Sequence, residues 1–177
     1  MSWLQSGIRL IYRRYTLEWD IHEQITITQV TRARVKVKGN RRYISGWSLY
    51  PFQDRHHHAR TLTLDRQTGK VIEAETHPFY RRLWLNPRVT IGDSIPISIR
   101  IKDPTELLFT VKGLDLKTAD MNHFNCWRFE ASFQNERYRI WYDDQDGLRI
   151  RFEALRQISQ HQFSAHTVWQ LQQIHMS

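Results

Sequence analysis

The chain has 177 residues, enough for one domain with a hydrophobic core. Lys and Arg number 26 against 18 Asp and Glu, and the net charge of +8 suggests either an anionic partner or a well-solvated cationic surface. The single cysteine excludes an internal disulfide, and no apolar run is long enough for a membrane-spanning helix.

The N-terminal residues combine apolar and basic side chains. Leu4, Ile8 and Tyr12 fall at helical spacing among arginines, which predicts a short basic amphipathic helix, but the same residues suit a first strand. We therefore divide the chain into an N-terminal basic segment, residues 1–14, and an antiparallel β domain, residues 15–177. The opening lacks the basic-then-apolar order of a signal peptide. We expect a cytoplasmic protein as the sequence is written, or an envelope or extracellular one if it is an excised mature domain.

From residue 15 onward the apolar residues alternate with polar ones. Isoleucines in residues 21–27 and valines in residues 35–37 alternate with Thr, Gln, Arg and Lys, which predicts strands with one apolar face and one cationic face. Gly39 and Asn40 predict the hairpin turn, and residues 43–50 the next strand.

The most basic local patch surrounds this hairpin. Its candidate anion-binding residues are Arg32, Arg34, Lys36, Lys38, Arg41 and Arg42. With Tyr43 and Trp47 they could follow a phosphate backbone and stack on bases, or bind an anionic membrane surface. We favour the alternative that they are outward positions of an edge hairpin, where Lys and Arg discourage aggregation, because no nucleic-acid-binding motif is present.

Three consecutive histidines, residues 56–58, follow Asp54 in a polar stretch. Imidazole is the commonest ligand for zinc, copper and nickel, so a metal site is one interpretation. Adjacent residues of an extended chain point to opposite faces, so at most His56 and His58 could converge on one ion. We favour a polar loop or strand here, and we predict no metal or other cofactor.

Two later segments share one turn pattern. Residues 65–70 follow a Thr-Leu-Thr-Leu strand and carry Gly69 where a positive φ is tolerated. Residues 143–148 look like a second copy of this device, with Gly147 in place of Gly69. We interpret the likeness as architectural and not as a sequence repeat. The acidic residues of the second segment do not match the spacing of a calcium hand.

The centre of the predicted sheet is residues 124–152, where two aromatic alternating runs, an Asp-Gly turn and a third run predict three consecutive antiparallel strands. Residues 97–101, 107–112 and 163–171 alternate in the same way. Counting such runs predicts a mainly β protein of roughly nine to eleven strands with little helix. The strands would form either a single curved antiparallel sheet, a half-barrel, or a β-sandwich.

No catalytic signature accompanies this architecture. Glycine-rich phosphate loops, His-Glu-x-x-His and paired Cys-x-x-Cys motifs are absent. Cys126 lies inside a predicted strand, where a buried inert thiol is the ordinary outcome, although a dyad with His123 is possible in principle. We leave open whether the protein is an enzyme and favour a non-catalytic role.

Three features of the second half resemble a known type of domain. They are the run from Trp84 to Pro96, the strand that ends at Gly113, and the Phe-Asn-Cys-Trp strand that begins at Phe124 and precedes the hairpin at residues 140–148. Over residues 79–155 the chain resembles uncharacterised bacterial and archaeal envelope domains, which are similar in turn to lipoprotein carriers of the LolA and LolB type. The resemblance implies a strongly curved antiparallel sheet that wraps a hydrophobic ligand or acyl chain, and it implies no catalytic residue.

Three functional hypotheses follow. The first is a non-catalytic β-sheet binding module whose concave aromatic face holds a lipid or another hydrophobic or amphipathic small molecule. The second is a basic protein that binds nucleic acid or an anionic membrane surface through the patch described above. The third is an enzyme on the same half-barrel. For the first hypothesis the candidate ligand-binding residues are Trp47, Trp84, Trp127, Trp141 and Trp169.

Overall fold

The structure is a computed structural model that describes residues 3–16, 19–46, 56–74, 82–86, 88–98 and 106–176. For residues 19, 41–46 and 56–60 the description is limited to the backbone. All the regular secondary structure within these ranges is β-strand. The same ranges contain no helix long and apolar enough to cross a bilayer.

Eleven strands form one antiparallel sheet that is open, with β5 at one end and β6 at the other. The mainly β prediction of a single curved antiparallel sheet is confirmed, and the sandwich alternative is not what the structure has, because all these strands belong to one sheet. In spatial order the strands are β5 (Val71–Ala74), β4 (His56–Asp65), β3 (Arg34–Gly46), β2 (Trp19–Val30), β1 (Arg9–Thr16), β11 (Gln162–His175), β10 (Arg149–Ser159), β9 (Glu136–Asp143), β8 (Asn122–Phe133), β7 (Glu106–Ala119) and β6 (Ser94–Ser98).

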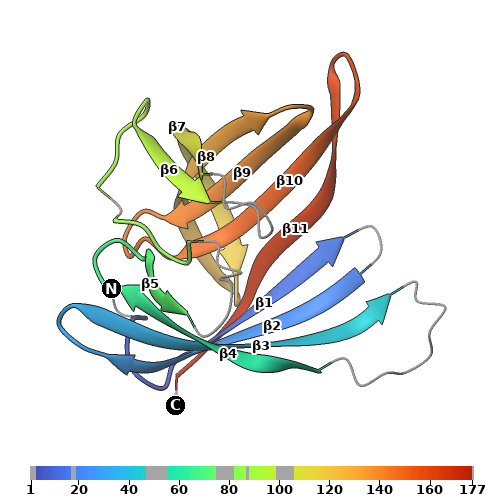
Figure 1. Ribbon diagram of the computed structural model, residues 1–177. Helices are drawn as coiled ribbons and strands as arrows, with labels where there is room; N and C mark the ends of the chain where they lie inside the picture. Colours follow the sequence, from blue (N-terminus) through green and yellow to red (C-terminus); the bar gives the residue numbers. More distant parts are fainter. Residues whose placement is uncertain are drawn as a thin grey trace.

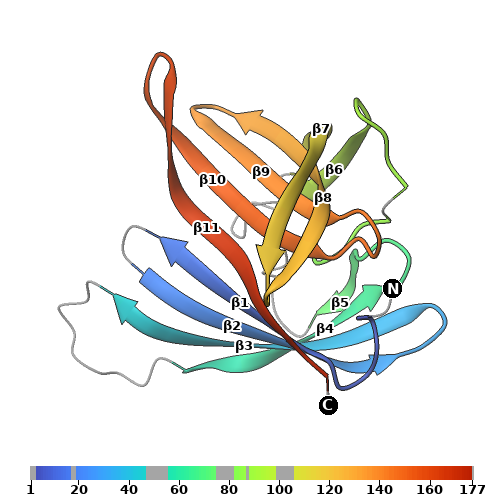
Figure 2. The same ribbon diagram turned by 180° about the vertical axis from the view of Figure 1, so that it is seen from behind.

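The sheet is bent into two lobes that diverge from β11 (Figures 1 and 2). Strands β1 to β5 form the first lobe and β6 to β10 the second, and β11 pairs with β1 on one side and β10 on the other. We call the face that carries Phe129, Phe152 and Trp169 the inner face, and the opposite one the outer face. The junction of the lobes is the part of the sheet around β1, β11 and β10.

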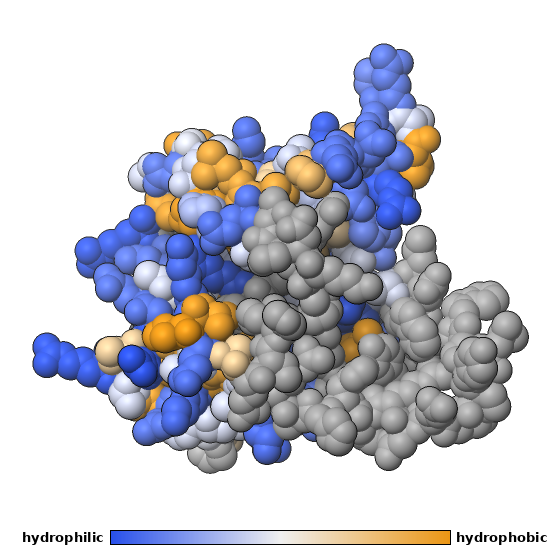
Figure 3. All heavy atoms as spheres, viewed as in Figure 1, coloured by the Kyte–Doolittle hydropathy of each residue, from blue (hydrophilic) through white to orange (hydrophobic). Residues whose placement is uncertain are grey.

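Two clusters of buried apolar side chains form the core, and the first also includes Ala119, Cys126 and Trp141 from the outer face of the second lobe. In the first lobe, isoleucines of β2 and valines of β3 pack against Trp3, Leu4 and the crossing segment, residues 82–86. In the second lobe the cluster is built around Phe109 and Phe129. The described surface in Figure 3 is mostly hydrophilic, with hydrophobic side chains in separate patches. The alternation along each strand has therefore sorted apolar from polar side chains between the two faces.

Of the two alternatives for the N-terminal residues, the structure has the strand, and the predicted helix is wrong. β1 lies in the middle of the sheet and pairs with β2 and β11. Leu10 and Tyr12 are completely buried on the inner face. A short helix is marginal in isolation, whereas a strand with partners on both sides satisfies its backbone hydrogen bonds. Residues 9–14 are thus part of the same sheet as the following strands.

The first hairpin turn lies earlier in the chain than predicted. β2 and β3 are joined at residues 31–33, where the Thr31 N–H donates to the Arg34 carbonyl oxygen at 2.8 Å. The Thr31 hydroxyl accepts a hydrogen bond from the Arg34 N–H at 3.0 Å. Gly39 and Asn40, the predicted turn, lie inside β3. The pairing of β3 with β4 shifts register just after Gly39, so this glycine marks a β-bulge.

Candidate functional site

One row of side chains crosses the inner face from strand to strand. Phe129 pairs with Ile140, Ile140 with Phe152, and Phe152 with Trp169, so these apolar side chains are neighbours on β8, β9, β10 and β11. The row continues across the junction, because Trp169 pairs with Arg14 of β1. It therefore changes from apolar to cationic where the two lobes meet.

A second arginine reaches the same place from β10. Arg149 is only 2% exposed, and its Cζ lies 4.9 Å from the ring centre of Tyr12 and 5.1 Å from that of Trp169. The Cζ of Arg14 lies 5.3 Å from the Trp169 ring centre. The Tyr12 hydroxyl donates a hydrogen bond to the Arg149 carbonyl oxygen at 2.6 Å. We call Tyr12, Arg14, Arg149 and Trp169 the junction cluster.

Electrostatics at the junction cluster involve one acidic side chain as well. Burial raises the pKa of Tyr12 well above its ordinary value, the charge of Arg149 acts against this rise, and the charge of Glu23 adds to it. Glu23 lies opposite Tyr12 in the pairing of β1 with β2. The phenol therefore keeps its proton and acts as a hydrogen-bond donor.

A second polar group lies farther along the inner face. Tyr138, whose ring stacks on Phe152 at 6.3 Å, donates its hydroxyl proton to the Glu136 carboxylate. The Nε2 atom of His166 and the Nη2 atom of Arg156 each lie 3.5 Å from the same carboxylate. Because this carboxylate already has several partners, the group makes one end of the inner face polar without adding an isolated charge.

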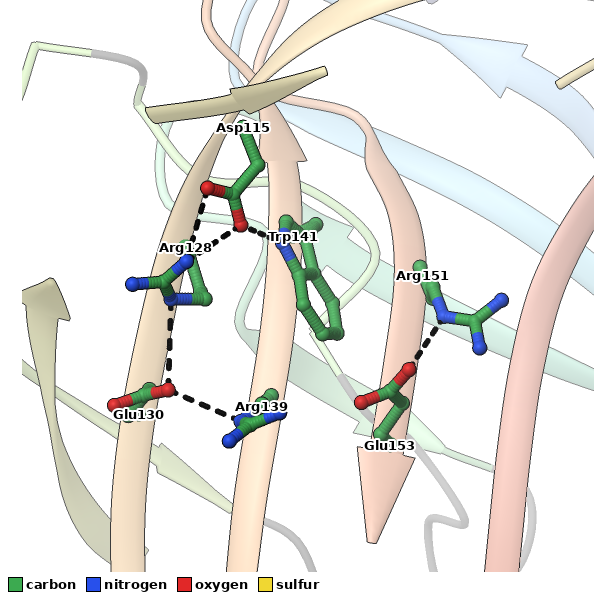
Figure 4. Close-up of polar contacts among 7 residues, drawn as sticks. All are labelled: Asp115, Arg128, Glu130, Arg139, Trp141, Arg151 and Glu153. Atoms are coloured by element: carbon green, nitrogen blue, oxygen red, sulfur yellow. Dashed lines mark hydrogen bonds and ion pairs between the residues drawn. The ribbon is translucent and has the colours of Figure 1, made fainter. Parts of the chain in front are cut away.

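The outer face of the second lobe carries a ladder of paired charges (Figure 4). The Arg128 guanidinium donates to Asp115 at 2.8 Å, and its Nε lies 3.4 Å from Glu130. Glu130 in turn pairs with the Nε atom of Arg139 at 3.0 Å. Carboxylates and guanidinium groups thus alternate across β7, β8 and β9, so the ladder neutralises its own charge.

Trp141 belongs to the outer face, where it pairs with Arg128 and Arg151 on the neighbouring strands. Its indole N–H donates to Asp115 at 2.8 Å, and the Lys117 Nζ lies 4.2 Å from its ring centre. Burial acts to raise the pKa of Asp115, but the hydrogen bond from Trp141 and the charge of Arg128 hold it below its ordinary value. The expectation that all the candidate tryptophans share one face is therefore wrong, because Trp141 supports the charge ladder.

The other candidate tryptophans take three different positions. Trp169 lies in the inner row, and Trp127 is partly buried against the same cluster. Trp84 is completely buried on the crossing segment, with its ring centre 5.5 Å from that of Trp3. Trp47 lies outside the described residues. Of the five predicted ligand-binding tryptophans, Trp127 and Trp169 therefore lie on the inner face.

No known protein family, curated protein or solved structure matches this chain. The resemblance to envelope β-domains and lipoprotein carriers therefore stays a prediction.

The predicted anion-binding residues follow β3 and the turn before it. The structure describes four of their side chains, all of them exposed: Arg32, Arg34, Lys36 and Lys38. Arg41 and Arg42 lie in β3, but their side chains are outside the described part of the chain. The described cations thus form a row on the outer face of the first lobe.

Among the side chains that the structure describes, Cys126 and the predicted histidines form no reactive group. Burial raises the pKa of the Cys126 thiol to about 12, which disfavours the thiolate, and His123 contacts the Thr118 hydroxyl at 3.2 Å. His56 and His58 lie in β4, with side chains outside the description. Among the residues that are described, His, Cys, Asp and Glu side chains form no group of three that could hold a metal.

The junction cluster is the part of the site that the sequence pattern missed. In residues 148–152, Arg149 and Arg151 alternate with apolar residues, so the pattern assigns both arginines to the outer face. A register shift between them brings Arg149 to the aromatic rings of the inner face. The adjacent residues Arg13 and Arg14 could have indicated this cluster. Two consecutive strand residues point to opposite faces, so one of the two arginines must lie on the inner face.

Proposed function

We propose that this protein is a non-catalytic binding module that holds an apolar or amphipathic molecule against its inner face. The observation that supports the proposal best is the inner row, in which Phe129, Ile140, Phe152 and Trp169 follow one another over four neighbouring strands. These four side chains are at most 2% exposed, so the molecule would have to displace neighbouring side chains of their cluster to lie against them. An apolar wall with a few placed polar groups is typical of sites for small hydrophobic ligands. The junction cluster supplies such polar groups at the end of the row.

The crossing segment limits where such a molecule would lie. The Leu83 carbonyl oxygen accepts a hydrogen bond from the Arg149 N–H at 2.8 Å, and the Leu85 N–H donates to the Gly147 carbonyl oxygen at 3.0 Å. This segment therefore occupies the inner face beside the start of β10. Arg14 is only half-buried, so the ligand would reach the row from the Arg14 side.

Quenching of tryptophan fluorescence by ω-bromododecanol tests the proposal, because bromine quenches an indole that it contacts. We expect saturable quenching with one molecule bound per chain. Trp169→Phe should lower the maximum quenching, since Trp169 lies in the inner row. Trp141→Phe is the matched control, because it removes an indole of the outer face and should leave the quenched signal in place. Quenching that does not saturate, or that is the same in Trp169→Phe, would contradict the proposal.

A second candidate function is binding to an anionic membrane surface through the outer face of β3. Arg34, Lys36 and Lys38 point to one side of the strand and are exposed. The residues opposite Lys36 and Lys38 on β4 are the uncharged Thr63 and Thr61. Arg34 lies opposite Asp65, so Lys36 and Lys38 are the two that face uncharged residues on β4. Cations about 7 Å apart on a strand suit a surface of lipid phosphates.

Sedimentation with vesicles tests this second candidate. We expect binding to vesicles that contain phosphatidylserine, no binding to phosphatidylcholine alone, and a steep loss of binding with added salt. The double variant Lys36→Gln with Lys38→Gln should bind more weakly. Lys112→Gln, which removes an exposed lysine of β7 in the other lobe, should bind like the wild type. Equal sedimentation with both lipids would exclude this candidate.

A further inference from the structure

One row of side chains on the outer face of the first lobe places a hydroxyl group between two cations. Arg9 pairs with Thr26 in the register of β1 with β2, and Thr26 pairs with Lys38 in the register of β2 with β3. Residues that pair directly across strands point to the same face. That face is the outer one, because the chain neighbours Leu10 and Val37 are buried on the inner face. We call Arg9, Thr26 and Lys38 the outer triad.

The spacing of the outer triad suits one small anion. Neighbouring strands lie about 4.8 Å apart, so the Cα atoms of Arg9 and Lys38 are about 10 Å apart, with Thr26 midway between them. Arg9 and Lys38 are exposed, and Thr26 is half-buried. Two long cationic side chains on either side of one hydroxyl can therefore converge on an anion that lies above it.

A neighbouring amide prepares the hydroxyl of the triad to donate. The Nε2 atom of Gln24 donates a hydrogen bond to the Thr26 hydroxyl oxygen at 3.3 Å. A hydroxyl has one proton and two lone pairs, so the amide occupies a lone pair and leaves the proton for another acceptor. The outer triad thus offers a guanidinium, an ammonium and a hydroxyl proton to one anion.

The two cations of the triad keep their charge available. Asp20 of β2 pairs with Arg13 at 2.6 Å and not with a residue of the triad. In the part of the chain that the structure describes, neither Arg9 nor Lys38 forms an ion pair with a carboxylate. The residue opposite Lys38 on β4 is the uncharged Thr61. A ligand that brings two negative charges would therefore balance the triad.

We propose that the outer triad binds a phosphate monoester, carried by a lipid of the membrane surface to which the second candidate function assigns this face. The inference rests on that candidate function and adds the chemical class of the head group. A phosphate monoester has three acceptor oxygens and a charge of about −1.5 to −2 at pH 7, which matches three donors and two cations. A phosphate diester has a single charge and would leave one donor of the triad to water.

Sedimentation with two kinds of vesicle tests the inference. One kind contains phosphatidylcholine with phosphatidic acid, a phosphate monoester, and the other contains phosphatidylcholine with phosphatidylglycerol, a phosphate diester. Their compositions are adjusted to the same zeta potential, so that the general attraction of cations to the surface is equal. We expect the wild type to bind the phosphatidic acid vesicles about tenfold more tightly, as one additional charge-assisted hydrogen bond allows.

Variants of the outer triad test whether it causes this preference. Arg9→Gln and Thr26→Val should each bring the two affinities together, because each removes one donor. Thr26→Ser keeps the hydroxyl and should keep the preference. Arg88→Gln is the matched control for Arg9→Gln, since it removes an exposed arginine that lies outside the first lobe, and it should also keep the preference.

The outcomes separate the inference from the second candidate function. Equal binding to both kinds of vesicle by the wild type would overturn the inference and leave the candidate function standing. A preference that survives in either Arg9→Gln or Thr26→Val, or that disappears in Arg88→Gln, would show that other residues select the head group and would overturn the inference as well.

Glycerol 3-phosphate, a soluble phosphate monoester, distinguishes the source of the ligand. If the protein bound neither kind of vesicle, the second candidate function would be wrong. Saturable binding of glycerol 3-phosphate that is lost in Arg9→Gln, measured by calorimetry, would then support the monoester site with a soluble ligand. Absence of that binding too would overturn both the inference and the candidate function.

Discussion

The two Asp–Gly turns of the sheet share one backbone geometry but place their aspartates in opposite electrostatic surroundings. In the first turn, between β4 and β5, the Asp65 N–H donates to the Lys70 carbonyl oxygen at 2.8 Å and the Gly69 N–H to that of Asp65 at 2.9 Å. The Asp65 carboxylate accepts the Thr68 N–H at 2.7 Å and its hydroxyl at 2.8 Å. These hydrogen bonds, the amide first, hold the pKa of Asp65 below its ordinary value although burial acts against them.

The second turn, between β9 and β10, repeats these hydrogen bonds at the same spacings. The Asp143 N–H donates to the Leu148 carbonyl oxygen at 2.8 Å, the Gly147 N–H to that of Asp143 at 2.9 Å, and the Asp146 N–H to the Asp143 carboxylate at 2.9 Å. Asp143 is only 6% exposed, and this burial raises its pKa. The comparison shows that local sequence sets the turn, whereas the packing around it sets the energy of the carboxylate.

The crossing segment joins the two turns. The Trp84 indole N–H donates to the carbonyl oxygen of Arg66, in the first turn, at 3.0 Å. Trp84 also forms an isolated bridge with Leu148, at the end of the second turn. Side chains on this segment therefore connect elements of the two lobes that are far apart in the sequence.

Trp84→Ala should have the largest effect, because it removes the side chain that packs against the first turn beside the bridge to the second. We expect a loss of about 3–5 kcal/mol in the free energy of unfolding, measured by urea denaturation, since Trp84 is completely buried. Trp84→Phe keeps most of the apolar volume and should lose roughly half as much. A loss below about 1 kcal/mol for Trp84→Ala would mean that the segment does not hold the turns together.

Replacing a turn glycine with alanine should lower the free energy of unfolding less than Trp84→Ala does, and the loss should differ between the two turns. Gly69 has a φ of 70°, and a Cβ there would lie 2.6 Å from the Trp84 carbonyl oxygen. Gly147 has a φ of 68°. Positive φ costs alanine about 1 kcal/mol at either site, and the contact with backbone at Gly69 adds to that cost. We expect Gly69→Ala to lose about 2–3 kcal/mol and Gly147→Ala about 1 kcal/mol in urea denaturation. Equal losses would contradict the close approach of Trp84.

Much of the fold could be predicted from the sequence, because alternation and turn residues are local properties. The two Asp–Gly turns are where the pattern placed them, and Gly69 and Gly147 have the expected positive φ. The Gly39–Asn40 prediction failed because the residue types that favour a tight turn also suit a β-bulge inside a long strand. The choice between these two depends on how far the partner strand extends, which no local pattern contains.

The candidate site could be predicted only in part, because it depends on register. The sequence predicts that five tryptophans line one face, whereas pairing across strands places Trp169 on the inner face and Trp141 on the outer one. A shift of one residue exchanges the faces of a strand, and the register shift before Arg151 is such a case. The alternation of apolar and polar residues therefore could not predict that Arg149, which belongs to the junction cluster, lies on the inner face.

The smallest expected effect, and the sharpest test of the comparison, is the pH dependence of the two turn aspartates. The folded pKa of Asp65 lies below its unfolded value of about 3.9, so its contribution to stability is present above that value and lost as the pH falls through the folded pKa. The folded pKa of Asp143 lies above its unfolded value, so its contribution is present at low pH and lost as the pH rises through the folded pKa.

Urea denaturation of the wild type, Asp65→Asn and Asp143→Asn over a series of pH values tests this difference in sign. On acidification the stability of the wild type relative to Asp65→Asn should fall, and its stability relative to Asp143→Asn should rise. Asparagine keeps an oxygen that can accept the same backbone N–H, so the turn hydrogen bonds remain and the titration is isolated. If the stability of the wild type relative to both variants changed in the same direction with pH, packing would not place the two aspartates in different surroundings. Changes of opposite sign would require two distinct environments for the aspartates, because the hydrogen bonds within the turns are alike.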